Sequence, residues 1–87
     1  MSRFKFEVDA EADTYCNEVV GTMVALFGIS EAEALGRINR YWMGKRLIGP
    51  NCPIYHESPE YFAKTIWYGP NVAWWKGEEG LSGSQFP

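Results

Sequence analysis

Residues 9–33 read DAEADTYCNEVVGTMVALFGISEAE, and this stretch decides the fold. Between residues 12 and 27 the apolar positions recur at steps of three and four, which is the spacing of one buried stripe on an α-helix. Asp9 is a suitable N-cap for this helix, and Gly28 can end it in a left-handed conformation. The spacing therefore predicts a helix over residues 10–27. Its buried stripe comprises Ala12, Tyr15, Cys16, Val19, Val20, Met23, Val24 and Phe27.

The end of the same stretch predicts a second helix. Ser30 and Glu33 have the spacing of a capping box, in which each side chain accepts a hydrogen bond from the other residue's backbone N–H. We expect this helix to run from Ser30 to about Gly44. At 100° per residue its apolar positions share one arc, and Arg37 and Arg40 lie on the other side with Gly44. The apolar arc comprises Ala34, Leu35, Ile38, Tyr41 and Trp42.

A third helix and a strand complete the predicted elements. Residues 58–60, Ser-Pro-Glu, give a cap, a proline at the first helical position and an early acid, and Gly69-Pro70 ends the helix. Residues 3–8 alternate strictly and predict a strand with Phe4, Phe6 and Val8 on one face. We expect that strand to pair with the apolar run at residues 71–75, or with the same strand of a second copy. The inward positions of the third helix are Phe62, Ala63, Ile66 and Trp67.

These elements predict a mainly α domain of the α+β type, with three helices, an N-terminal strand and a short aromatic C-terminal segment. A length of 87 residues corresponds to one domain. We place the folded unit at residues 1–77. The glycine- and serine-rich composition of residues 78–87 predicts a flexible tail.

The charged residues are unevenly distributed. The net charge of −3 disfavours nucleic acid and anionic lipid as partners. Residues 34–56, however, contain Arg37, Arg40, Lys45 and Arg46 and no acid, so only this segment could meet an anion. No apolar run is long enough to span a membrane, and the alternating N-terminus does not look like a secretion signal. We therefore expect a cytoplasmic protein with reduced cysteines.

Residues 26–40, Leu-Phe-Gly-Ile-Ser-Glu-Ala-Glu-Ala-Leu-Gly-Arg-Ile-Asn-Arg, form the join between the first two helices. Within residues 19–40 the chain resembles the turn and second helix of helix-turn-helix proteins. The resemblance implies DNA binding, for which the candidate residues are Arg37, Arg40, Lys45 and Arg46. Two departures count against it, because Glu31 and Glu33 stand where the family's second helix enters the major groove. Arg37 also has an intrahelical partner in Glu33.

Cys52 and His56 raise a further alternative, a thiol-dependent enzyme in which the histidine activates the thiol. A third group would have to orient the histidine, and Asn51 or Glu57 could supply it. A structural zinc site needs about four ligands, and only Cys16, Cys52 and His56 offer nitrogen or sulfur. The sequence therefore predicts no metal and no cofactor, and a protein that is not an enzyme.

Aromatic residues are more numerous than so short a chain can easily enclose. The chain has four Trp, five Tyr and five Phe residues, so some must stay partly exposed. Exposed Trp and Tyr are typical of protein interfaces. We therefore predict a protein-interaction or self-associating module that binds another protein or its own copy as a dimer. The candidate partner-binding residues are Trp67, Tyr68, Trp74 and Trp75.

Overall fold

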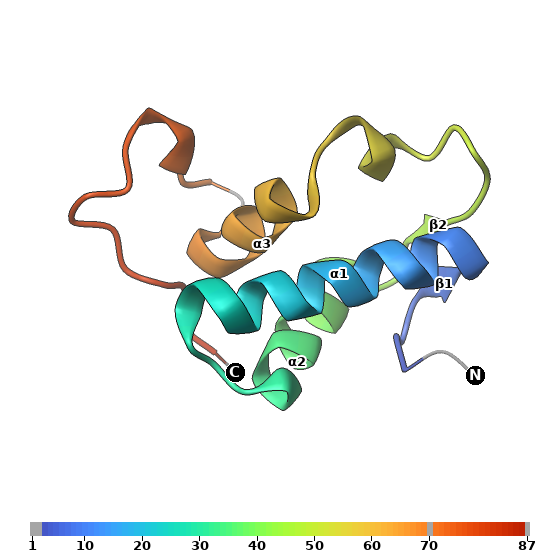
Figure 1. Cartoon of the computed structure of the whole chain (residues 1–87), viewed down its shortest axis with the longest axis horizontal. Helices are drawn as coiled ribbons and strands as arrows, with labels where there is room; N and C mark the ends of the chain where they lie inside the picture. The colour runs from blue at the N-terminus through green and yellow to red at the C-terminus, as the bar shows by residue number, and fades with distance from the viewer. Residues whose placement is uncertain (1–2, 70, 87) are drawn as a thin grey trace.

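The computed structural model describes residues 3–69 and 71–86, and Figure 1 shows their arrangement. Within these residues three helices dominate, with one pair of two-residue strands and two 3-10 turns. The predicted mainly α class with a small β component is therefore confirmed. In chain order the elements are β1 (Glu7–Val8), α1 (Ala10–Phe27), α2 (Glu31–Tyr41), β2 (Arg46–Leu47), η1 (Pro53–His56), α3 (Pro59–Tyr68) and η2 (Trp74–Lys76).

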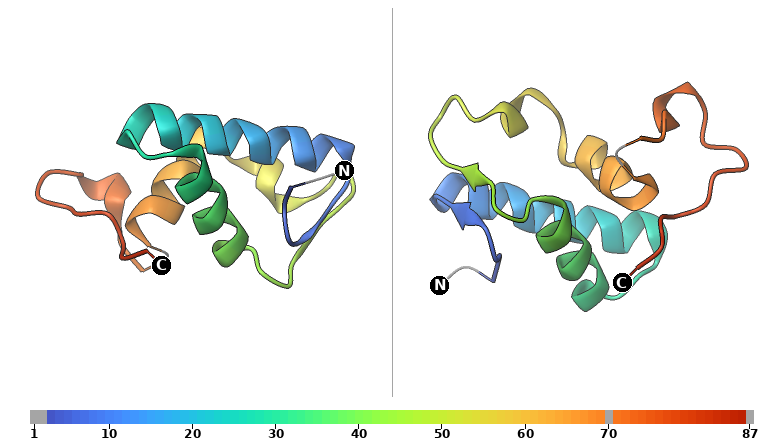
Figure 2. Two further views of the ribbon diagram at one scale, coloured as in Figure 1. Left: turned by 90° about the horizontal axis from the view of Figure 1, so that it is seen from below. Right: turned by 180° about the vertical axis from the view of Figure 1, so that it is seen from behind.

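Helix α1 is the centre of the fold, with α2 and α3 packed against it (Figure 2). The Asp9 side chain accepts a hydrogen bond from the backbone N–H of Ala12, and Gly28 ends the helix at φ +65° with its N–H donating to Val24. The predicted bounds, caps and apolar stripe are confirmed. Its most buried members are Ala12, Cys16, Val19, Val20 and Met23, and the remaining three pack on the core as half-buried residues.

Helix α2 begins as predicted and ends earlier. The Ser30 hydroxyl accepts a hydrogen bond from the N–H of Glu33 at 3.0 Å, which is half of the predicted capping box. Among the described residues the second half is not formed, and the Glu33 carboxylate instead accepts a charge-assisted bond from Arg37 Nε at 2.9 Å. The α-helix stops at Tyr41, and a turn leads to Gly44, whose φ of +77° reverses the chain toward β2.

The predicted N-terminal strand buries the side chains that the sequence predicted, but it pairs with a different segment. Phe4 and Phe6 are buried and Lys5 is exposed, so the predicted alternation is confirmed. Only Glu7–Val8 is a strand, and it pairs in parallel with Arg46–Leu47. The predicted pairing with residues 71–75 was therefore wrong, and pairing with the same strand of a second copy stays a prediction. Residues 74–76 form the 3-10 turn η2 and not a strand.

Asp9 links the chain segments that leave the two parallel strands at the same end of this small sheet. Its carboxylate accepts hydrogen bonds from the N–H of Gly49 at 2.8 Å and of Ala12 at 2.9 Å. These bonds hold the pKa of Asp9 below its ordinary value, and the bond from Gly49 has the largest effect. The residue therefore caps α1 and also fixes the chain that follows β2.

Helix α3 agrees with the prediction at both ends. Ser58 caps it by accepting a hydrogen bond from the N–H of Tyr61, and Gly69 follows its last residue. Ala63 and Ile66 are buried against α1, and Phe62 and Trp67 are the half-buried members of the predicted inward face.

The C-terminal segment, expected to be a flexible tail from its composition, makes specific contacts with the domain. The N–H of Ser84 donates to the carbonyl of Trp67 at 2.6 Å. Gly83 lies so close to the Trp67 indole that an added Cβ would overlap it, and the Phe86 ring occupies the space beside Gly36. The segment therefore covers one side of α2 and the end of α3. Among the described residues, no helix is long and apolar enough to cross a membrane.

Candidate functional site

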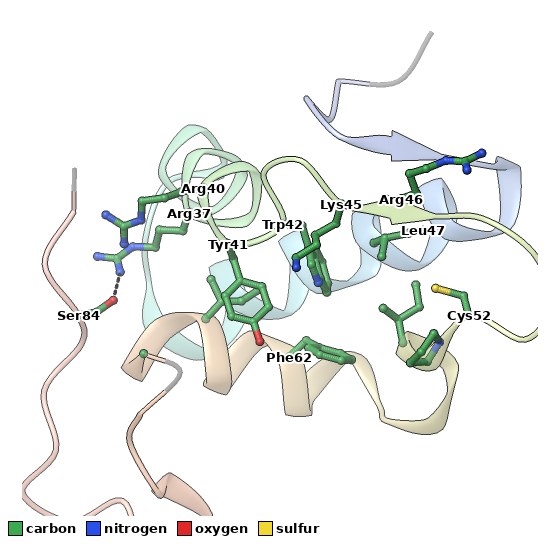
Figure 3. A pocket seen from close by; sticks show the side chains of 14 residues that line it. Arg37, Arg40, Tyr41, Trp42, Lys45, Arg46, Leu47, Cys52, Phe62 and Ser84 are labelled. Atoms are coloured by element: carbon green, nitrogen blue, oxygen red, sulfur yellow. Dashed lines mark hydrogen bonds between the residues drawn. The ribbon is translucent and has the colours of Figure 1, made fainter.

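A cavity of about 790 Å³ lies between the C-terminal end of α2, strand β2, turn η1 and helix α3 (Figure 3). We call it the groove. Its size falls within the range of about 300–1,000 Å³ that is typical of ligand-binding sites. Apolar side chains form much of its lining: Trp42, Leu47, Pro53, Ile54, Phe62 and Ile66.

Local features of the chain bring these apolar residues together. Trp42 follows the last residue of α2, and its indole packs on Phe6 at 5.6 Å and on Phe62 at 5.3 Å between ring centroids. Leu47 is held by the pairing of β2 with β1, and Ile54 is buried in η1. The groove therefore depends on the end of α2, strand β2 and turn η1. The turn at Gly44 and the loop after β2 bring these three segments beside α3.

The polar lining of the groove is basic. Arg37, Arg40, Lys45 and Arg46 all line it, and no Asp or Glu is among the described residues that do so. Arg37 and Arg40 lie at one end, and Arg46 and Cys52 lie at the other (Figure 3). Lys45 extends beside Trp42 between the two ends. Cations beside an apolar surface attract an apolar group that carries negative charge.

The four bases differ in how they are bound. Lys45 is exposed, and within residues 3–69 and 71–86 it has no ion-pair partner. Arg46 forms a surface ion pair with Glu7 at 2.6 Å, in which both side chains are largely exposed. Arg40 donates to the carbonyl of Gln85 at 3.1 Å. Lys45 and Arg40 are therefore the bases with the most capacity left for a ligand.

Arg37 is buried, although the sequence placed it on the side of the second helix away from the apolar arc. The side chain keeps its predicted partner Glu33 and also donates from Nη1 to Ser84 Oγ at 3.0 Å. Its guanidinium lies 4.5 Å from the centroid of the Trp67 ring and 5.2 Å from that of Phe86. The C-terminal segment folds over this side of α2, so only 4% of Arg37 is exposed.

This arrangement bears on the candidate DNA contacts. Arg37 is committed to contacts within the domain, and Arg46 is paired with Glu7. At the start of α2, which the helix-turn-helix resemblance would direct toward the major groove, Glu31 is exposed. DNA binding through Arg37, Arg40, Lys45 and Arg46 stays a prediction, and the free cations available for it are fewer than the sequence indicated.

The predicted aromatic partner surface is largely used by the domain itself. Trp67 stacks on Phe27 with 4.5 Å between ring centroids. The Tyr68 hydroxyl donates to Glu78 at 2.8 Å, and Trp74 Nε1 donates to Thr65 Oγ1 at 3.1 Å. Trp75 differs from the other candidates because it is 60% exposed. Of the four residues, it is the most exposed, and the other three are half-buried.

The structure does not bring Cys52 and His56 together, as the predicted thiol-dependent enzyme would require. Cys52 is buried in the lining of the groove, whereas His56 is exposed at the end of η1. Among the described residues no hydrogen bond connects the two. Cys16 is buried within α1, and burial raises the pKa of its thiol to about 12. Both cysteines are free, and no three His, Cys, Asp or Glu side chains of the described chain are grouped to hold a metal ion.

The sequence missed several residues that build the groove. Leu47 and Ile54 stand in a segment with no helical periodicity, and Ser84 belongs to the expected tail. The one signal in the sequence was the segment 34–56, which has four bases and no acid. All four of those bases line the groove.

No protein-family model, curated protein or solved structure matches the chain. Its function is therefore inferred from the chemistry of the groove.

Proposed function

We propose that this chain is a non-enzymatic interaction module whose groove binds an apolar, acidic segment of a partner protein. The observation that carries the proposal is the lining of the groove, in which an apolar surface is bordered by four bases and, among the described residues, by no acid. The two free cysteines are compatible with a reducing compartment, and we place the protein in the cytoplasm.

The two parts of the lining have different roles. The apolar residues stabilise the complex, because burial of apolar surface contributes roughly 25 cal/mol per Å². The bases select the partner, because an acid beside Lys45 or Arg40 is attracted and a base is repelled. A partner segment therefore needs aromatic or aliphatic side chains that enter the groove, with Asp or Glu beside them.

A protein segment fits the groove better than the backbone of a nucleic acid. Phosphate binding relies on exposed cations, and Arg37 is buried while Arg46 is paired with an acid. The apolar lining would contribute nothing to a phosphate contact. A peptide with alternating apolar and acidic side chains would use both parts of the groove.

Labelled synthetic peptides test this function. One set combines Leu and Trp with Glu, at the spacing of a strand in some peptides and of a helix in others, and matched sets carry Gln or Lys in place of Glu. We expect the Glu set to bind about tenfold or more tighter than the Lys set, with an affinity that falls as salt is added. Fluorescence polarisation measures the dissociation constants.

Charge-reversal variants locate the binding. Lys45→Glu combined with Arg40→Glu should weaken binding of the Glu peptides by about tenfold or more. Lys5→Glu is the matched control, since Lys5 is exposed and does not line the groove. If the Glu peptides bind no better than the Lys peptides, or if Lys5→Glu weakens them as much as the groove variants, the proposal is wrong. Binding of a duplex oligonucleotide without binding of any Glu peptide would favour the helix-turn-helix alternative instead.

A further inference from the structure

Residues 74–81 form a compact projection that we call the knob. Its side chains contact α3, and its loop projects away from α1 and α2, as the views from front and behind show (Figures 1 and 2). The knob consists of turn η2 and the following turn, which the N–H of Leu81 closes by donating to the carbonyl of Glu78 at 3.1 Å.

The knob is held against α3 by side-chain contacts. Trp74 donates to Thr65, and its ring lies 5.6 Å from the centroid of Tyr61. Glu78 accepts hydrogen bonds from Lys64 Nζ at 2.7 Å and from the Tyr68 hydroxyl at 2.8 Å. These bonds, of which that from Lys64 has the largest effect, lower the pKa of Glu78. The knob therefore has a defined shape before it meets any partner.

The outer surface of the knob is apolar and carries a net charge of −1, because Glu78 and Glu79 outnumber the exposed Lys76. Trp75 is 60% exposed and Leu81 is 37% exposed, and both are large apolar residues. Glu79 is exposed between them in the chain and, within residues 3–69 and 71–86, has no ion-pair partner. Neither Trp75 nor Leu81 lines the groove of its own chain. The knob thus presents the kind of surface that the groove is proposed to bind.

We propose that the groove receives the knob of a second copy of this chain. Trp75 and Leu81 of one copy enter the apolar part of the groove of the other, and Glu79 faces the basic residues Lys45 and Arg40. This inference rests on the proposed function, because it names the partner of the same groove. A cavity of about 790 Å³ has room for an indole and a leucine side chain together.

Charge complementarity favours contact between the knob of one copy and the groove of another over contact between two grooves. Two grooves facing each other would bring together eight bases, since four line each of them. A knob facing a groove brings a net charge of −1 to the cations, with Glu79 at Lys45 and Arg40 and Lys76 left at the rim, and it removes the most exposed tryptophan from water. Strand exchange across a two-fold axis is not needed, because β1 is already paired with β2.

Light scattering of the purified full chain over a range of concentrations tests the inference. We expect the parent protein to form dimers or larger assemblies. Trp75→Ala should weaken this association by about tenfold or more, as for the loss of a central aromatic anchor. Lys45→Glu should weaken it to a similar extent. Leu26→Ala is the matched control, because Leu26 is 45% exposed and belongs to neither the knob nor the groove.

Mixing the two variants gives the decisive measurement. Trp75→Ala retains an intact groove and Lys45→Glu retains an intact knob, so a mixture should form a complex that neither variant forms alone. Circular dichroism and thermal unfolding establish that both variants are folded. A monomeric parent, a Trp75→Ala variant that associates like the parent, or a mixture that stays monomeric would each overturn the inference.

The outcome is separable from that of the proposed function. The labelled Glu peptides are also titrated into the Trp75→Ala variant, whose groove is unchanged. If they bind while the parent protein is monomeric, the second copy is the wrong partner and the groove still binds acidic segments. If they do not bind, the proposed function itself has failed.

Discussion

Replacement of Arg37 by methionine tests whether the buried guanidinium joins the C-terminal segment to the domain. Methionine preserves most of the apolar length of the side chain and removes its charge and its donors. The variant loses the hydrogen bonds to Glu33 and Ser84 and the contacts of the guanidinium with the Trp67 and Phe86 rings.

The expected effect follows from these contacts. Hydrogen bonds to charged groups contribute about 1.5–3 kcal/mol each, and a desolvated cation–π contact about 2 kcal/mol. Glu33 is 33% exposed and regains hydration, which reduces the loss. We therefore expect the free energy of unfolding to fall by about 3 kcal/mol, and the melting temperature by about 12 °C or more for a domain of this size.

Urea unfolding monitored by tryptophan fluorescence measures the change, with Arg40→Met as the control. Arg40 is exposed, donates one hydrogen bond to Gln85 and lies 5.0 Å from the centroid of the Phe86 ring. Because solvent screens both contacts, its replacement should lower the free energy of unfolding by only about 1 kcal/mol. Glu33→Gln completes a double-mutant cycle with Arg37→Met, and the coupling free energy should exceed about 0.5 kcal/mol. Equal effects of the Arg37 and Arg40 replacements would refute the assignment of Arg37 as the buried link.

Three further predictions concern other parts of the fold. Hydrogen bonds keep the pKa of Asp9 low in the folded protein, and the bond from the Gly49 N–H has the largest effect. Ionised Asp9 therefore stabilises the fold fully above the pKa that it has in the unfolded chain. This contribution is lost as the pH falls through the pKa of the folded state. Asp9→Asn should therefore differ most from the parent in urea midpoint at neutral pH, and the difference should shrink in acid. Gly83→Ala overlaps a packed indole and should destabilise by about 1–3 kcal/mol, whereas Gly21→Ala, which meets no neighbouring atom in α1, should stabilise by about 0.5–1 kcal/mol in the same assay. Burial raises the pKa of the Cys16 thiol to about 12, so mass spectrometry after iodoacetamide treatment at pH about 8 should find Cys16 unmodified until urea unfolds the protein.

The sequence determined the three helices. Asp9, Ser30 and Ser58 all accept a hydrogen bond from a backbone N–H three residues later, and each begins the helix that it was expected to begin. The apolar stripe of α1 is buried as its spacing predicted. These features could be predicted because a cap and a helical stripe depend on residues within a few positions of one another.

Only the tertiary structure decided the remainder. The pairing of β1 with β2, the burial of Arg37 beneath the C-terminal segment and the groove itself join residues far apart in the sequence. The four bases of residues 34–56, with no acid among them, indicated that this segment could bind an anion. The sequence did not show that these bases border one apolar cavity. Such contacts depend on how whole elements pack and on which loop reaches which helix. Local propensity and periodicity carry no information about either.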